Sequence, residues 1–134
     1  MADGWRRNHG SASPFEPVYG YSRAVRVGNR IDVAGCAPIE PDGSSTVGDA
    51  GVQAARCLTI IGEALEALGG SFADVVRTRM YITDAADADR VGQAHGAIFG
   101  AIRPAATMLV IPALIRPEWK VAIEAEAILS ESSC

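Results

Sequence analysis

The sequence predicts a single α+β domain, in which a mixed sheet of about five to six strands carries two helices on one face. Its 134 residues match the usual size of one domain, and 49% of them are apolar, which is enough to bury a core. Strand-like alternation and two helix-like apolar periodicities follow one another along the chain. We expect the domain to span residues 16–130, between flexible tails at 1–15 and 131–134.

The first two strands form a predicted hairpin within residues 19–36. The segment RAVRV leads into Gly28 and Asn29, a pair that favours a tight turn between antiparallel strands. The segment RIDVAGC follows, and in it Ile31 and Val33 alternate with charged residues. This alternation predicts one apolar face and one polar face.

A long helix is predicted over residues 52–68. The loop before it contains the turn sequence Pro-Asp-Gly, and Asp49 is placed to cap the first turn. Gly69 and Gly70 supply the stop signal. Apolar residues recur at steps of three and four, at Leu58, Ile61, Leu65 and Leu68.

A strand and a second helix follow. The segment DVVRTRMYIT has strand periodicity, with Val76, Thr78, Met80 and Ile82 on one side and Arg77, Arg79 and Tyr81 on the other. The helix begins near Asp84 or Asp87 and ends near Gly100, before the dipeptide Arg-Pro. His95 lies among the apolar positions of this helix, which favours a packed, hydrogen-bonded histidine over a catalytic base.

Two strands complete the predicted sheet. The segment AATMLVI is apolar on both faces, as expected of a strand buried on both sides. The segment WKVAIEAEA alternates, with Trp119, Val121 and Ile123 on the helix side and Glu124 and Glu126 on the other. Because it lies on the helix side, Trp119 is expected to pack in the core.

The face that the helices leave uncovered mixes apolar and charged side chains. Such a face is too apolar for water, and its charges need partners because an unpaired buried charge is strongly destabilising. We therefore expect copies of the same chain to cover it. Strand parity places on this face Asp32, Ala34, Arg77, Arg79, Tyr81, Met108, Val110, Ala122, Glu124 and Glu126.

Composition excludes several function classes. The net charge of −4 and the scattered basic residues argue against nucleic-acid binding. No apolar run approaches the roughly 18–20 residues of a membrane span, and the N-terminus lacks an apolar leader, so we expect a cytoplasmic protein. The cysteines Cys36, Cys57 and Cys134 have no CxxC spacing, and no phosphate-loop glycine pattern occurs, so no metal or cofactor is predicted.

Several stretches together resemble the Rid family, the YjgF-type reactive intermediate deaminases that are also labelled L-PSP endoribonucleases. They are GYSRAVRVGNRIDVAG, ALGG, VVRTRMYITD, AHGAIFGAIRPAATMLVIPALI and VAIEAEAI, in the order typical of the family. The resemblance implies a chorismate-mutase-like fold. It also implies a homotrimeric barrel whose sheets face inward, with small-molecule clefts between subunits.

The resemblance also implies which positions form the cleft. In the best-known branch, an arginine binds the carboxylate of an enamine or imine, which water hydrolyses to a keto acid and ammonia. That arginine falls on Ala106, so the chain looks like a subgroup that lacks it. The branch's serine, asparagine and cysteine positions fall on Ala34, Gly92 and Met108.

Two family positions keep their chemistry. Tyr21 matches the aromatic residue that closes the cleft, and Glu124 matches the acid that orients the water. Gly35 and Cys36 follow Ala34, and Thr107 follows Ala106, and these three residues complete the predicted binding set. Cys36 has an alternative reading as a small buried hydrophobe, and Thr107 as a residue that caps the strand.

Three charged residues keep two interpretations each. Glu126 shares a strand face with Glu124, so it is either a second acid or base or an ion-pair partner of Arg77 or Arg79. Arg103 and Arg116 flank the apolar strand and either replace the missing arginine or lie in solvent or an interface.

The sequence thus favours an enzyme that hydrolyses a small reactive enamine or imine between subunits, with water as nucleophile and no cofactor. A non-catalytic trimeric module that binds a metabolite or a protein is the main alternative, because the carboxylate-binding arginine is missing. An endoribonuclease is the third, and the acidic chain without paired histidines gives it little support.

Overall fold

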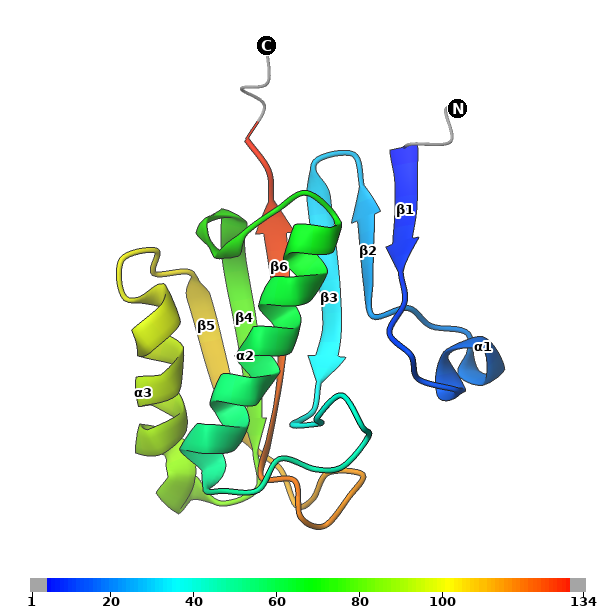
Figure 1. Cartoon of the computed structure of the whole chain (residues 1–134). Coiled ribbons are helices and arrows are strands. Elements are labelled where there is room, and N and C mark those ends of the chain that lie inside the picture. Colours follow the sequence, from blue (N-terminus) through cyan, green and yellow to red (C-terminus); the bar gives the residue numbers. More distant parts are fainter. Residues whose placement is uncertain (1–4, 131–134) are drawn as a thin grey trace.

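A computed structural model describes residues 5–130, and the predicted tail at 131–134 lies outside the described residues. The chain forms one six-stranded mixed sheet in the order β1-β2-β3-β6-β4-β5, with α2 and α3 packed on one face (Figure 1). The predicted α+β fold with two helices on one face is confirmed. The elements are β1 (Arg6–His9), α1 (Phe15–Tyr19), β2 (Ala24–Val27), β3 (Arg30–Cys36), α2 (Ala50–Ala67), β4 (Val75–Ile82), α3 (Ala88–Phe99), β5 (Ala105–Val110) and β6 (Val121–Ile128).

The sheet is antiparallel except at one edge. β2 and β3 form the predicted hairpin, and Gly28 in its turn has a φ of 60°, which glycine adopts without strain. β6, the last strand in sequence, lies between β3 and β4 and is antiparallel to both. β5 runs parallel to β4, and α3 supplies the crossover that a parallel pair requires.

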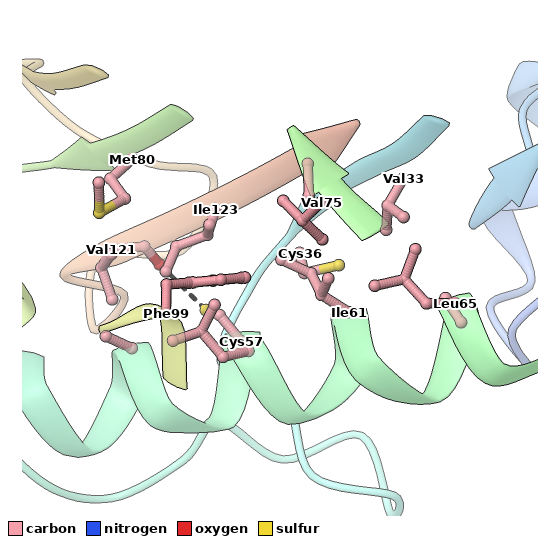
Figure 2. Close-up of a cluster of buried hydrophobic side chains, with 14 of the residues drawn as sticks. Val33, Cys36, Cys57, Ile61, Leu65, Val75, Met80, Phe99, Val121 and Ile123 are labelled. Atoms are coloured by element: carbon pink, nitrogen blue, oxygen red, sulfur yellow. Dashed lines mark hydrogen bonds between the residues drawn. The ribbon is translucent and has the colours of Figure 1, made fainter. Parts of the chain in front are cut away.

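The core lies between α2 and the sheet (Figure 2). The side chain of Asp49 accepts a hydrogen bond of 3.0 Å from the backbone N–H of Val52, which confirms the predicted N-cap. The helix ends before Gly69, whose φ of 90° suits only a residue without a side chain. Fully buried side chains from α2, α3 and three strands fill this layer, among them Ile31, Ile61, Leu65, Phe99, Val121 and Ile123.

The N-terminal segment differs from the predicted tail. Residues Arg6–His9 form the edge strand β1, which pairs antiparallel with β2, and Arg7 Nη2 donates to the carbonyl of Leu68 at 3.2 Å. In α1 the rings of Phe15 and Tyr19 stack with centroids 5.5 Å apart. The sequence RRNH has no apolar residue to bury, so hydrophobic periodicity carries no sign of this strand.

β5 differs from prediction in both burial and parity. It is an edge strand, with Leu109 48% and Val110 57% exposed, so it is not buried on both sides within one chain. Met108 was predicted on the uncovered face, but it pairs in register with Met80 and packs against the helix-side core. Val110 pairs with Ile82 in the same register, so it too lies on the helix side instead of the uncovered face. An apolar strand without polar alternation cannot reveal its parity from sequence.

Two further predictions of side-chain placement are wrong. Val76 is 43% exposed, because the register between β4 and β6 shifts between Val75 and Arg77 and turns Val75 inward instead. Trp119 precedes β6 and does not join the core. Its Nε1 donates to the hydroxyl of Ser45 at 2.9 Å. Within residues 5–130 no helix is long and apolar enough to cross a membrane.

Candidate functional site

A depression of about 400 Å³ lies on the face of the sheet that the helices leave uncovered. It brings together Tyr21, Ala34 and Glu124, three of the residues that the sequence predicts for the site. They reach it from the segment before β2, from β3 and from β6. The N-terminal strand β1 adds Arg6 and Asn8 to the same wall.

Glu124 is held at both carboxylate oxygens. Oε2 accepts a hydrogen bond from Arg79 Nη1 at 3.1 Å, and Oε1 accepts one from the hydroxyl of Tyr81 at 2.9 Å. The hydrogen bond to Glu124, followed by burial, raises the pKa of Tyr81, so its phenol remains a donor. The side chain of Glu124 is 31% exposed, which leaves the fixed carboxylate open to a water molecule or ligand.

Glu126 takes part in a charge network beside Glu124. Arg79 Nη1 contacts Glu126 Oε2 at 3.1 Å, and Arg30 Nη2 contacts Glu126 Oε1 at 3.3 Å. Arg30 also pairs with Asp32 at 3.0 Å. The predicted ion pairing of Glu126 across the sheet is confirmed for Arg79.

The end of β3 is fixed by an arginine from the start of the hairpin. Arg23 Nη1 donates to the carbonyl of Gly35 at 3.3 Å and to Cys36 Sγ at 3.2 Å. Ala34 faces the depression and Gly35 is exposed, whereas Cys36 is fully buried in the core (Figure 2). Burial raises the pKa of the Cys36 thiol, which matches its reading as a small hydrophobe.

Like Gly35 and Cys36, the four other predicted binding residues do not line the depression of the single chain. Ala106, Thr107 and Met108 are on β5, which β6 and β4 separate from β3. Thr107 pairs in register with Arg79 and so shares its face of the sheet. Gly92 lies on α3, and a methyl group added there would meet no atom within 4 Å.

Neither loop arginine reaches the depression. Arg116 Nη1 donates to the carbonyl of Gly43 at 3.1 Å, and its guanidinium lies 5.1 Å from the ring centroid of Trp119. Arg103 adopts a φ of 59° after α3, where its N–H donates to the carbonyl of Phe99 at 2.8 Å. Arg116 therefore has a local structural role, whereas the side chain of Arg103 is exposed.

His95 is a packed residue, as its helix position suggests. Its Nε2 lies 2.8 Å from the hydroxyl of Thr78, and its ring centroid lies 4.6 Å from that of Phe99. Burial lowers the pKa of His95, which favours the neutral ring. In the part of the chain that the structure describes, no group of three or more His, Cys, Asp or Glu side chains is placed to hold a metal ion.

Sequence reasoning missed three residues on the same face as Glu124, namely Tyr81, Arg6 and Asn8. Tyr81 had a usable signal, because strand parity places it on the uncovered face, and a phenol can reach a neighbouring carboxylate. Arg6 and Asn8 had none, since their strand carries no apolar alternation. Asn8 Nδ2 donates to the hydroxyl of Ser22 at 2.9 Å and so ties β1 to the segment that carries Tyr21.

The chain is similar to proteins and structures of one family. The family profile described as endoribonuclease L-PSP matches residues 11–129. An uncharacterised protein of Streptomyces coelicolor is 35% identical over 117 residues, 87% of each chain. The mouse 2-iminobutanoate/2-iminopropanoate deaminase is 32% identical over 109 residues, 81% of this chain and 80% of that protein.

A solved structure extends the similarity to three dimensions. The crystal structure of a member of the YjgF/YER057c/UK114 family from Mycobacterium tuberculosis has a TM-score of 0.85 and 41% identity. It covers 92% of this chain and 99% of its own. The sheet order, the helix layer and the extent of the match agree, and we conclude that this chain belongs to the Rid/YjgF family, which is also described as the endoribonuclease L-PSP family.

Proposed function

We propose that this protein hydrolyses the C=N bond of a small reactive imine, or of the enamine that tautomerises to it, in a cleft between subunits of a homotrimer. The observation that carries the proposal is Glu124, a partly exposed carboxylate fixed at both oxygens in a depression that Tyr21 also lines. The mouse relative, a deaminase of 2-imino acids by name, supports the same reaction class.

The reaction needs a positioned water and a route for its proton. Water adds to the carbon of C=N and one of its protons goes to the nitrogen. The resulting carbinolamine then breaks its C–N bond as its hydroxyl proton moves to the nitrogen, which gives a carbonyl compound and ammonia. Glu124 accepts a hydrogen bond from the water and directs its lone pair at the carbon. Arg79 and Tyr81 hold the carboxylate in place during this step, and no cofactor takes part.

Neighbouring copies of the chain complete the cleft in this proposal. The uncovered face carries an ion-pair network, and the edge strand β5 exposes Leu109 and Val110. An exposed apolar edge strand invites pairing with another chain. A neighbouring subunit would bring Ala106, Thr107 and Gly92 towards the Tyr21 side of the depression.

The substrate differs from that of the standard 2-imino acid deaminases. Ala106 stands where those enzymes carry the carboxylate-binding arginine, so a carboxylate has no anchor on β5. Ala106 and Gly92 also leave space that larger side chains fill in that branch. The space and the missing anchor favour a substrate of another shape, held from a different strand.

Ammonia release tests this function. Freshly generated 2-aminoacrylate and the imine of an uncharged ketone would be offered to the wild type, to Glu124→Gln and to Glu126→Gln. We expect the wild type to accelerate hydrolysis of at least one of them, and Glu124→Gln to lose at least about tenfold in rate with less effect of Glu126→Gln. No acceleration over buffer for either compound contradicts the proposal.

A non-catalytic binding module is the second candidate, favoured by the two partners that already occupy the oxygens of Glu124. A thermal-shift screen with keto acids, amino acids and aromatic metabolites separates the two. A stabilising ligand without turnover supports binding alone.

Ribonuclease activity is disfavoured, because the carboxylates Asp32, Glu124 and Glu126 around the depression repel phosphate. Incubation with RNA after rigorous nuclease removal tests for this activity.

A further inference from the structure

Two arginines face each other on the helix side of the β1–β2 pair. Arg7 of β1 lies directly opposite Arg26 of β2 in the antiparallel register. Arg26 in turn lies opposite Ile31, which is fully buried in the core, so this side of the strands is the one that faces α2. Like charges directly opposite each other on neighbouring strands are destabilising. The arginine pair is therefore favourable only where negative charge offsets it.

The C-terminal end of α2 supplies part of that negative charge. Arg26 Nη1 donates to the carbonyl of Leu68 at 2.8 Å, and Arg7 Nη2 donates to the same oxygen at 3.2 Å. A methyl group added to Gly69 would lie 2.8 Å from Arg26 Nη1, so the glycine leaves room for the guanidinium group. The carbonyls at a helix C-terminus together carry about half a negative charge. Two guanidinium groups carry two positive charges, so a surplus of positive charge remains.

The carboxylates of the chain do not remove this surplus. Among residues 5–130, neither Arg7 nor Arg26 forms an ion pair. Glu63 and Glu66, the acidic residues in the last two turns of α2, are exposed and do not lie within ion-pairing distance of either arginine. The positive charge is therefore available to an anion from outside the chain.

Both guanidinium groups also have N–H donors to spare. Arg26 uses Nε for the carbonyl of Gly28 at 2.8 Å and Nη1 for Leu68, which leaves Nη2. Arg7 uses Nη2 alone, which leaves Nε and Nη1. Arg7 is exposed and Arg26 is partly exposed, so solvent reaches these groups. Donors from two converging guanidinium groups suit a group with several anionic oxygens, and arginine binds phosphate in this way.

We propose that Arg7 and Arg26 form a binding site for a phosphate group beside the C-terminal end of α2. The ligand class is inorganic phosphate or a small phosphate monoester. The site lies on the opposite face of the sheet from the depression, since the neighbouring residues Arg6 and Val25 line the depression. It does not depend on the reaction proposed for that depression.

Phosphate titration of the full chain in its native oligomeric state tests this site. Inorganic phosphate and glycerol phosphate would be added at constant ionic strength in place of chloride, because salt screens exposed charges. We expect saturable NMR shifts at the amides of β1, β2 and residues 68–70. Arg7→Gln and Arg26→Gln should each weaken binding about tenfold or more, as loss of a charge-assisted contact predicts. Tighter binding of glycerol phosphate would identify a phosphate monoester as the ligand, and equal binding would identify the phosphate group alone.

Arg6→Gln is the matched control. Arg6 lies on the same strand, faces the other side of the sheet and likewise has no ion pair within residues 5–130, so this variant should bind phosphate as the wild type does. Arg7→Lys should recover part of the affinity that Arg7→Gln loses, since it keeps the charge but not the fork. Circular dichroism checks that each variant is folded, and the Arg7 variants decide the result if Arg26→Gln unfolds.

Three results would overturn the proposal. They are the lack of a saturable shift in the wild type, equal phosphate affinity in Arg7→Gln and the wild type, and an equal loss of affinity in Arg6→Gln. The last of these would show a general effect of net charge and not a site at Arg7 and Arg26.

Thermal stability gives an independent measurement. A ligand that binds only the folded chain raises Tm as its concentration rises, whereas phosphate also stabilises proteins in general by its exclusion from their surface. The Tm of the wild type should therefore rise more with phosphate than the Tm of Arg7→Gln does. An equal rise in the two proteins would assign the effect to the salt and count against the site.

Discussion

The hydroxyl of Tyr81 donates a hydrogen bond of 2.9 Å to Glu124 Oε1, while Arg79 occupies Oε2. The tyrosine and the glutamate come from adjacent antiparallel strands, β4 and β6. Their contact fixes the carboxylate at the point where the family position predicts a water-orienting acid. Tyr81, which the sequence analysis placed on the mixed uncovered face without a role, therefore helps to orient the carboxylate of Glu124.

This contact predicts a measurable titration of Tyr81. Its pKa is raised above the ordinary value of 10.0, first by the hydrogen bond to Glu124 and then by burial. Because the folded state holds the proton more tightly, the associated stability is complete below pH 10.0 and is lost as pH rises through the folded value. Ultraviolet absorbance of tyrosinate should show a phenol that ionises above pH 10.0.

Substitution of the acceptor checks the cause. In Glu124→Gln the amide no longer opposes a phenolate, so the late tyrosine titration should move to lower pH. Tyr81→Phe should remove it altogether and identify the signal. An unchanged titration in Glu124→Gln would show that burial alone raises the pKa of Tyr81.

The register shift in β4 predicts a strong contrast between two core-like residues. Ile123 is fully buried beneath α2, so Ile123→Ala should lower the free energy of unfolding by about 2–5 kcal/mol. Val76 is 43% exposed despite its place in an apolar alternation, so Val76→Ala should change it by less than about 0.5 kcal/mol. Urea denaturation at one protein concentration measures both, and similar losses for the two variants would contradict the register.

Much of the fold can be predicted from the apolar periodicity of the sequence. The helix capped by Asp49, the hairpin turn at Gly28 and the alternation of β6 all appear where local pattern and burial agree. The parity of β5 could not be predicted, because Met108 and its neighbours are apolar on both sides. β1 could not be predicted either, since backbone pairing and polar contacts hold it.

Some residues of the candidate site could likewise be predicted from the sequence, and others could not. Tyr21, Ala34 and Glu124 were predicted from family positions and meet in one depression, although they are distant in sequence. Ala106 does not join them within one chain, and no pattern along a single chain reports what a neighbouring copy contributes. The contact of Tyr81 with Glu124 depends on a register between strands that sequence alone does not fix.

The buried environment of His95 predicts a second pH effect, at the acidic end. Burial lowers its pKa below the ordinary value of 6.5, so the unfolded chain takes up a proton first as the pH falls. Stability should therefore decline as pH drops below 6.5 towards the folded pKa. His95→Gln should show a smaller decline in Tm over this range than the wild type; equal declines in the two proteins would exclude His95 as the cause.

The exposed edge strand β5 predicts that assembly depends on apolar residues of the uncovered face. Leu109 is 48% exposed in the single chain and pairs in register with Tyr81, so it shares the face that subunits would cover. A charge there would be buried without a partner in the proposed trimer, which costs several times the energy of a surface change. Leu109→Asp should therefore sediment as a smaller species than the wild type at micromolar concentration.

A matched variant on the helix layer controls for the added charge. Val52 is 49% exposed on α2, on the opposite side of the molecule, and Val52→Asp should sediment as the wild type does. Circular dichroism of Leu109→Asp should retain the helix signal if only assembly is lost. A wild-type protein that sediments as one 14.0 kDa chain would remove the trimer, and with it the reason for placing β5 beside the depression of a neighbouring copy.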